Sequence, residues 1–193
     1  MAKKESTLVN MLIALFVITF VASTSLGLVY QVTKEPIAAA KLAKKIEAIQ
    51  NVVPEFNNQP NAEEYKVATE NGDSLTLYPA KKDGELVGTA VESSTNLGFT
   101  GEIKVMIGFL PDGTIKDVAV LEHKETPGLG DKMERKKSDW SLQFQGKNPS
   151  TFKIAVTKDG GDVDAITAST ISSRAFCDAV ERAYITYMKG VKK

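Results

Sequence analysis

A cluster of small hydroxyl residues near the C-terminal end has the composition of an anion-binding site. Thr167, Ser169, Thr170 and Ser172 follow Asp164 within a few positions, and a run with helical spacing begins directly after them. The first N–H groups of a helix have no partner inside the helix, and the helix dipole adds partial positive charge there. The cluster therefore predicts a phosphate site at a helix N-terminus, although an ordinary helix cap has the same composition.

A second run combines one proline with two glycines shortly before this cluster. It contains Glu125, Thr126, Pro127, Gly128, Leu129 and Gly130. Proline fixes φ and glycine permits tight backbone conformations, so on its own the run predicts a rigid turn. Small residues and exposed amides would also suit a flat ring that needs hydrogen bonds at its polar edge.

Composition limits the chemistry that the chain can supply by itself. The sequence has 193 residues with 24 basic and 24 acidic side chains, which is not the charge pattern of a nucleic-acid-binding protein. Cys177 is the only cysteine and His123 the only histidine, so no disulfide within the chain is expected and no metal site built from Cys and His. Any redox chemistry must therefore come from a bound cofactor.

Residues 8–30 carry no charged side chain and predict one membrane-spanning helix. A helix of that length is roughly 35 Å long, which is enough to cross a bilayer with some tilt. A cleaved signal peptide is the alternative, although its apolar region is usually shorter. Lys3 and Lys4 precede the span, so the N-terminus is expected in the cytoplasm and the following domain outside it.

The remaining pattern predicts one α+β domain with a mainly antiparallel sheet and flanking helices. Residues 37–53 have the spacing of an amphipathic helix that ends before Pro54, and residues 55–63 form a loop. Strands are expected at 75–78, 85–93, 102–110, 114–122 and 152–157, and a last helix over 172–189 that stops at Gly190. The expected parts are residues 1–30 (anchor), 31–63 (helix and loop) and 64–193 (domain).

Three segments of the sequence together resemble a known family. Residues 97–108, residues 123–130 and residues 164–173 are similar to the FMN-binding domain shared by the G subunit of Rnf-type electron-transport complexes and the C subunit of the sodium-pumping NADH:quinone reductase. With the N-terminal anchor the resemblance covers nearly the whole chain. The short length makes it more similar to the Rnf protein than to its longer relative.

The resemblance implies a site for each segment. In that family FMN is attached through a phosphoester to a threonine by a flavin transferase, and the matching acceptor here is Thr170. Asp164 would be a recognition feature for the transferase. Two residues depart from the family pattern, Ala168 for the usual Gly and Ser169 for the usual Ala, and Ser169 places a second hydroxyl beside the acceptor. The other implied cofactor contacts are Thr167, Ser169, Ser172, Glu125, Thr126, Gly128, Leu129 and Gly130.

The resemblance also implies a role and partners. The chain would be an electron-transfer subunit with covalent FMN in the inner membrane, not a complete enzyme, and other membrane, iron–sulfur and flavin subunits would be its partners. Such a complex moves electrons between ferredoxin and NAD while it transports ions. The alternatives are a C-type subunit of the quinone reductase and a membrane-anchored binding or assembly module without cofactor.

Overall fold

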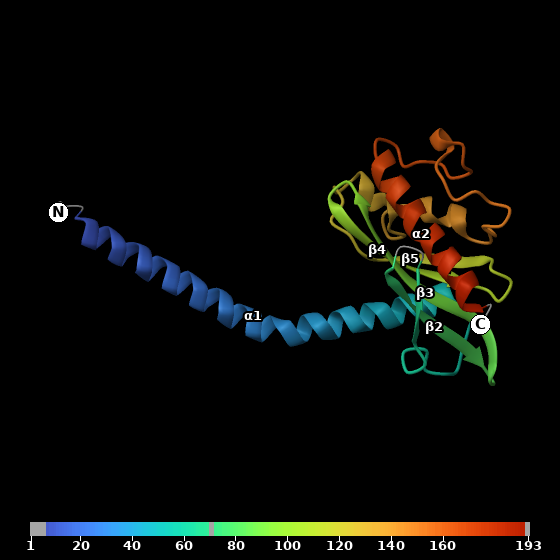
Figure 1. The fold of residues 1–193 in the computed structure, drawn as a ribbon, viewed down its shortest axis with the longest axis horizontal. Coiled ribbons are helices and arrows are strands. Elements are labelled where there is room, and N and C mark those ends of the chain that lie inside the picture. The colour runs from blue at the N-terminus through green and yellow to red at the C-terminus, as the bar shows by residue number, and fades with distance from the viewer. Residues whose placement is uncertain (1–6, 70–71, 192–193) are drawn as a thin grey trace. The chain divides into compact units, whose positions relative to one another are not determined.

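The structure is a computed structural model that describes residues 7–69 and 72–191 (Figure 1). Lys3 and Lys4, on which the predicted orientation of the membrane span depends, lie outside the described residues. The chain divides into two units, residues 1–43 and residues 44–193, and each is described by itself.

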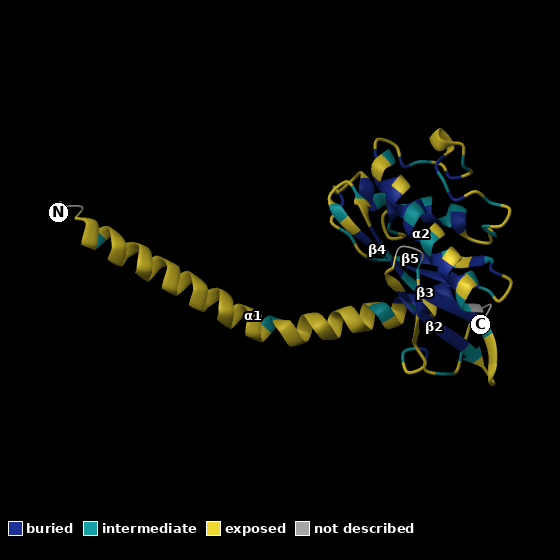
Figure 2. Cartoon of the chain, in the orientation of Figure 1, coloured by how far each residue is buried: buried dark blue, intermediate teal, exposed yellow. Residues whose placement is uncertain are grey.

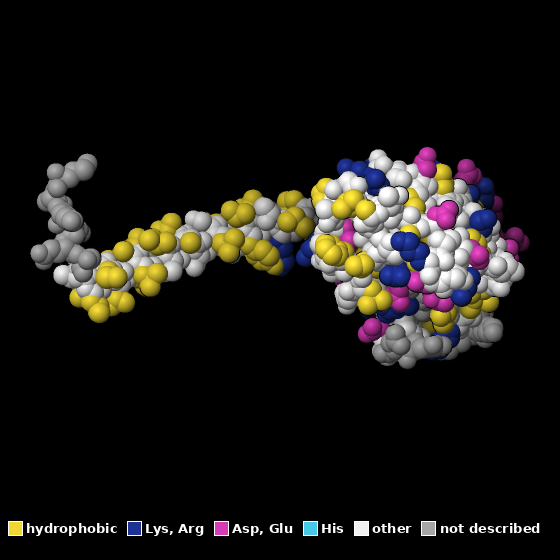
Figure 3. Space-filling model, turned by 90° about the horizontal axis from the view of Figure 1, so that it is seen from above, with side chains coloured by type: hydrophobic (Ala, Val, Ile, Leu, Met, Phe, Trp, Pro, Cys, Tyr) yellow, Lys and Arg dark blue, Asp and Glu magenta, His cyan; other side chains and the backbone are white. Residues whose placement is uncertain are grey.

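Helix α1 (Leu8–Val52) contains the predicted membrane span. Its most apolar window has a mean hydropathy of 2.4, and the helix is long and apolar enough to cross a membrane by length and composition. The side chains of its first part are exposed and largely apolar (Figures 2 and 3). Thr19 Oγ1 donates a 2.9 Å hydrogen bond to Leu15 O, so this hydroxyl is satisfied within its own helix.

One helix replaces the two helical segments that were predicted around Pro36, which lies inside α1. A proline removes one backbone donor and disfavours a helix interior, which is why the sequence suggested a break. The residues on both sides retain the other helical hydrogen bonds, and the helix continues to Val52, just before Pro54.

Five strands form one antiparallel sheet in sequence order, which confirms the predicted α+β class. The strands are β1 (Tyr65–Ala68), β2 (Ser74–Lys82), β3 (Glu85–Gly98), β4 (Gly101–Phe109) and β5 (Ile115–Glu122). The turn between β2 and β3 has positive φ at both Asp83 and Gly84, as expected for a two-residue hairpin turn. Strand β1 was not predicted, because it has only four residues and follows a polar loop.

The sheet is buried on both faces. Along β4, Ile103, Val105 and Ile107 belong to one core and Met106 to the other, following the two-residue period of a strand. Helix α2 (Thr170–Val191) covers the first face (Figures 1 and 2). On the second face Tyr78, Ala80, Ala90 and Met106 pack against Ala48, Ile49, Val52 and Val53 from the end of α1 and the next residue.

Helix α2 has the amphipathic pattern that the sequence predicted. Its buried face includes Phe176, Ala179, Val180, Ala183 and Tyr187. The predicted stop at Gly190 is wrong, since the helix includes this residue and ends at Val191. A Cβ at Gly190 would lie 3.2 Å from Val67 Cγ2, so the glycine lets the helix pass close to β1 instead of ending it.

The segment between β5 and α2 contains three short 3-10 helices, at Gly130–Met133, Trp140–Phe144 and Thr157–Asp159. The strand predicted over residues 152–157 is wrong. Ile154 and Val156 are buried in the first core, but this segment pairs with no strand, and Val156 makes only an isolated bridge to Val163. Arg174 donates two 2.7 Å hydrogen bonds to Asp159, which lower the pKa of that carboxyl and fix this segment to α2.

Cys177 is a buried thiol on α2, and burial raises its pKa from 9.0 to about 12. Because the thiolate is the reactive species, native protein at pH 8 is expected to react with iodoacetamide far more slowly than protein in denaturant. The stabilisation from the protonated thiol is complete below pH 9 and is lost as the pH rises towards 12. Equal rates of alkylation in native and denatured protein would contradict this burial.

Candidate functional site

One pocket brings together residues from all three sequence segments. Its volume is about 350 Å³, and it lies between the β3–β4 turn, the loop after β5 and the start of α2. These three regions are far apart in the sequence and meet because α2 begins beside the end of the sheet where β3 turns into β4. The pocket is lined by Phe99, Glu125, Thr126, Leu129, Ala168, Ser169, Thr170, Ile171 and Ser172.

Glu125 is the central polar residue of this pocket, and the residue is only 5% exposed. Its Oε1 accepts hydrogen bonds from Thr100 N at 3.0 Å and from Thr100 Oγ1 at 3.2 Å. Its Oε2 accepts a 2.5 Å hydrogen bond from Ser172 Oγ. Since three donors point at its two oxygens, the Glu125 side chain acts as an acceptor-only carboxylate that joins the three segments.

The two serines form a directed chain of hydroxyls. Ser172 donates its proton to Glu125, so the 2.8 Å contact between Ser169 Oγ and Ser172 Oγ must use the proton of Ser169. Both serines are buried. Ser169 precedes the first residue of α2, where a serine oxygen commonly caps backbone N–H groups, but here its hydroxyl bonds a side chain instead.

Two glycines make room for the carboxylate. A Cβ on Gly130 would lie 2.7 Å from Ser172 Oγ and 2.8 Å from Glu125 Cβ, and a Cβ on Gly98 would lie 2.8 Å from Glu125 Oε1. Neither position therefore accepts a side chain without movement of the site. Gly128 has a different role, because its φ of 78° favours glycine although the space around it is open.

The residues before α2 hold a strained turn. Ala168, one of the two departures from the family pattern, has a φ of 60°, a region that costs a residue with a Cβ about 1 kcal/mol more than glycine. The Ser173 hydroxyl stabilises the turn, because it accepts a 2.9 Å hydrogen bond from Ile166 N and donates a 3.0 Å bond to Ser169 O. The alanine therefore adopts the conformation that a glycine would take.

The remaining predicted residues are placed less centrally. Thr170 is half-buried and lines the pocket, whereas Thr167 and Gly128 are exposed and lie outside its lining. Asp164 is exposed, and its backbone is fixed by neighbours: Gln143 Oε1 accepts from Asp164 N at 2.7 Å, and Trp140 Nε1 donates to Asp164 O at 2.5 Å. The structure thus holds the Asp164 backbone in place while its side chain faces solvent.

Sequence reasoning did not assign three of the lining residues to the site. Phe99 and Ile171 are large apolar side chains that are 66% and 48% exposed, and Ala168 lies between the hydroxyl residues. Phe99 lies within the 97–108 segment that carried the family resemblance, but nothing in a single sequence shows that this hairpin tip reaches the start of α2.

His123, the residue after β5, holds the backbone of the loop that contains Glu125. Its Nδ1 accepts a 3.0 Å hydrogen bond from Glu125 N, which leaves the proton on Nε2, 3.0 Å from Glu134 Oε1. The imidazole therefore links the backbone of Glu125 to a second acidic residue. No group of three or more metal-ligating side chains occurs within residues 7–69 and 72–191.

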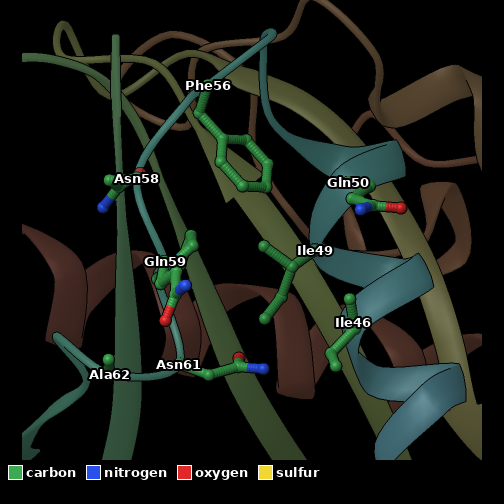
Figure 4. Close-up of a pocket in the computed structure, with 9 residues that line it drawn as sticks. Ile46, Ile49, Gln50, Phe56, Asn58, Gln59, Asn61 and Ala62 are labelled. Carbon is green, nitrogen blue, oxygen red and sulfur yellow. The ribbon is translucent and has the colours of Figure 1, made fainter. Parts of the chain in front are cut away.

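A separate cavity of about 510 Å³ lies on the other face of the sheet, between the end of α1 and the following loop (Figure 4). Ile46, Ile49 and Phe56 face it, with Asn58 and Asn61 opposite the helix (Figure 4). It contains none of the residues that the sequence singled out.

Comparison with known proteins agrees with the geometry of the first pocket. Residues 98–185 match the family described as FMN-binding domain, a range that contains all nine lining residues. The pocket thus belongs to a domain of the flavin mononucleotide-binding class.

Relatives identify the family more closely. The chain is 42% identical over 156 residues to the G subunit of the ion-translocating oxidoreductase complex of Erwinia tasmaniensis, covering 76% of this chain and 74% of the relative. It is 36% identical over 180 residues to that of Vibrio atlanticus, covering 86% and 85%, and 36% identical over 195 residues to that of Aliivibrio fischeri, covering 95% and 90%. The chain therefore belongs to the family of G subunits of ion-translocating oxidoreductase complexes of the Rnf type.

The packing around Gly130 gives a stability prediction. Gly130→Ala is expected to lower the free energy of unfolding by about 1–3 kcal/mol, because its Cβ forces Ser172 and Glu125 apart. Urea unfolding followed by circular dichroism measures this change. Gly27→Ala is the matched control, since a Cβ there meets nothing within 4 Å. An unchanged midpoint for Gly130→Ala would contradict the packing at Glu125.

Proposed function

We propose that this chain is a membrane-anchored flavoprotein subunit that relays electrons through one FMN, attached by a phosphoester to Thr170. The observation that carries the proposal is the state of the hydroxyls at the start of α2. Thr170 lines the pocket and its hydroxyl makes no side-chain hydrogen bond within the described residues, whereas Ser169 and Ser172 are bonded towards Glu125.

The start of α2 suits the phosphate of such a group. Thr170 is the first residue of a 22-residue helix, so the N–H groups of its first turn and the helix dipole favour an anion there. The neighbouring Ala168 is small and turns the backbone at positive φ, which keeps the approach open. The observed volume of about 350 Å³ lies at the lower end of the range for small-molecule sites.

The apolar residues of the pocket suit a flat ring. Phe99, Leu129 and Ile171 are 66%, 39% and 48% exposed, and they lie around the hydroxyls from three different segments. In the proposed complex they would cover part of the isoalloxazine, with Thr126 at its polar edge. FMN supplies one-electron and two-electron transfer, and the residues of the chain position it and exclude water.

In this proposal the chain is a relay, and the electron donor and acceptor are groups on other subunits. Relatives bear the name of a subunit of an ion-translocating oxidoreductase complex, and we infer that this chain joins a complex of that kind, with iron–sulfur and flavin subunits as partners.

Helix α1 would anchor the chain in the inner membrane, with the N-terminus in the cytoplasm and the FMN domain outside. In that location a covalent bond prevents loss of the flavin by dilution. A flavin transferase would attach it, and the exposed carboxylate of Asp164, on a backbone fixed by Gln143 and Trp140, is available as its recognition feature.

In-gel fluorescence tests the proposal. The full chain, co-expressed with its flavin transferase, is expected to fluoresce under ultraviolet light after denaturation, because only a covalent flavin survives that treatment. Absence of any fluorescent band would contradict the covalent attachment, and a purified native chain without flavin absorbance would then favour a binding module without cofactor. Purification in mild detergent tests the partners separately, and the chain is expected to bring iron–sulfur subunits with it.

A further inference from the structure

We propose that Glu125 selects the flavin acceptor: through Ser172 it keeps the Ser169 hydroxyl from reacting, so that FMN is joined only to Thr170. The inference rests on the proposed function, since it concerns which of two adjacent hydroxyls takes the flavin. It assigns Glu125 and Ser172 a role in specificity that is separate from contact with the ring.

The direction of the hydrogen bonds is the first reason. An acceptor hydroxyl must release its proton as its oxygen attacks phosphorus. The proton of Ser169 lies in the 2.8 Å contact to Ser172 Oγ, because Ser172 donates its own proton to Glu125 Oε2. For Ser169 to react, this buried chain would have to break and leave a buried polar group unsatisfied, which slows attack by that oxygen.

Charge is the second reason. A phosphodiester on Ser169 would place a negative charge two hydrogen bonds away from the Glu125 carboxylate, and Glu125 is only 5% exposed. Charges in a partly desolvated site repel more strongly than in water. Ser169 is itself only 9% exposed, so a phosphate there would also have to be accommodated inside the packed site.

Thr170 differs from Ser169 in burial and in hydrogen bonding. Both residues line the pocket, but Thr170 is half-buried where Ser169 is buried, and its hydroxyl donates to no group within the described residues. In the transfer step Thr170 Oγ1 forms a new bond to the flavin-side phosphorus of a flavin dinucleotide. The phosphoanhydride bond of the dinucleotide breaks, the nucleoside monophosphate leaves, and the hydroxyl proton passes to a base of the transferase.

Glu125→Gln reverses the hydrogen-bond chain without changing its size. The amide oxygen can accept from Thr100 N, which turns the NH2 group towards Ser172 Oγ. Ser172 can then donate to Ser169 Oγ, and the Ser169 proton becomes free for removal. The same substitution removes the buried negative charge.

The experiment maps the flavin by peptide mass spectrometry on full-length chains co-expressed with the transferase. Four variants are compared with the wild type: Thr170→Ser, Thr170→Ala, Thr170→Ala/Glu125→Gln and Thr170→Ala/Ser172→Ala. The wild type and Thr170→Ser are expected to carry flavin at residue 170 alone. Thr170→Ala is expected to carry none, and both double variants are expected to carry it at Ser169.

Three outcomes would overturn the selection by Glu125. Flavin at Ser169 in Thr170→Ala would show that Ser169 is not restrained, and two unmodified double variants beside a modified Thr170→Ser would show that Glu125 does not restrain it. An unmodified Thr170→Ser would show that the transferase rejects serine, so no selection is needed. If the variant with Glu125→Gln does not fold, the double variant Thr170→Ala/Ser172→Ala still tests the selection, because it removes the hydroxyl that links Ser169 to Glu125. A wild type without covalent flavin would instead refute the proposed function.

Discussion

Thr170→Ala is expected to abolish covalent flavin completely while the domain remains folded. The loss is complete because the substitution removes the oxygen that forms the phosphoester, and the restrained Ser169 hydroxyl does not replace it. The fold is expected to change little, since Thr170 Oγ1 makes no hydrogen bond within the described residues and surface substitutions of this kind usually cost about 0.5 kcal/mol or less. In-gel fluorescence and urea unfolding measure the two effects.

Thr151→Ala is the matched control for this variant. It removes the same hydroxyl from an exposed threonine that bonds Asn148 O, in a loop that does not line the pocket. Its flavin content is expected to equal that of the wild type. Wild-type fluorescence in Thr170→Ala would exclude Thr170 as the acceptor, whereas loss of flavin together with unfolding would show that the substitution acts through the fold.

Gly108→Ala is expected to have the largest effect on stability of any glycine-to-alanine substitution in this domain. A Cβ at this position in β4 would lie 1.8 Å from Val52 O and 2.5 Å from Val52 C, which is impossible without movement of the end of α1 away from the sheet. Such movement would expose Ile49 and Met106, which are buried in the second core. The expected loss exceeds about 3 kcal/mol, the upper end of the usual cost of overpacking.

Thermal unfolding of the detergent-solubilised chain measures this loss. Gly27→Ala makes the same chemical change inside α1 at a position where nothing lies within 4 Å, and its unfolding temperature is not expected to fall below that of the wild type, because alanine favours a helix more than glycine does. If Gly108→Ala unfolds at the wild-type temperature, the end of α1 does not pack against β4 as closely as the structure shows.

Strands and turns could be predicted from the sequence because their signals are local. The two-residue turn at Asp83 and Gly84 and the alternation along β4 each depend on neighbours in the chain. Predictions from the sequence were wrong where contacts between distant segments determine the secondary structure. Residues 152–157 have the composition of a strand but find no partner strand, and Gly190 continues a helix because β1, from the opposite end of the domain sequence, packs beside it.

The candidate site divides in the same way. Short motifs singled out Thr126, Leu129 and Thr170, and the structure places these three residues in the lining of one pocket. Glu125 was predicted only as a cofactor contact, and its hydrogen bonds could not be predicted, since its partners Thr100 and Ser172 lie 25 and 47 positions away.

The restraint on Ser169 also depends on tertiary contacts. From the sequence, Ser169 and Thr170 are two adjacent hydroxyls, and only the resemblance to the family favours Thr170 as the acceptor. In the structure, the hydrogen bonds from Ser169 through Ser172 to Glu125 and the deeper burial of Ser169 separate them.

The intact mass of the full chain, purified from membranes of cells that contain the flavin transferase, tests the central claim most directly. We expect the mass of the complete polypeptide plus one FMN less one water, which reports both the covalent flavin and the retention of α1. A mass equal to the unmodified polypeptide would contradict covalent attachment, even if FMN copurified and separated on denaturation. A mass lacking the N-terminal segment would show that this segment is a cleaved signal peptide.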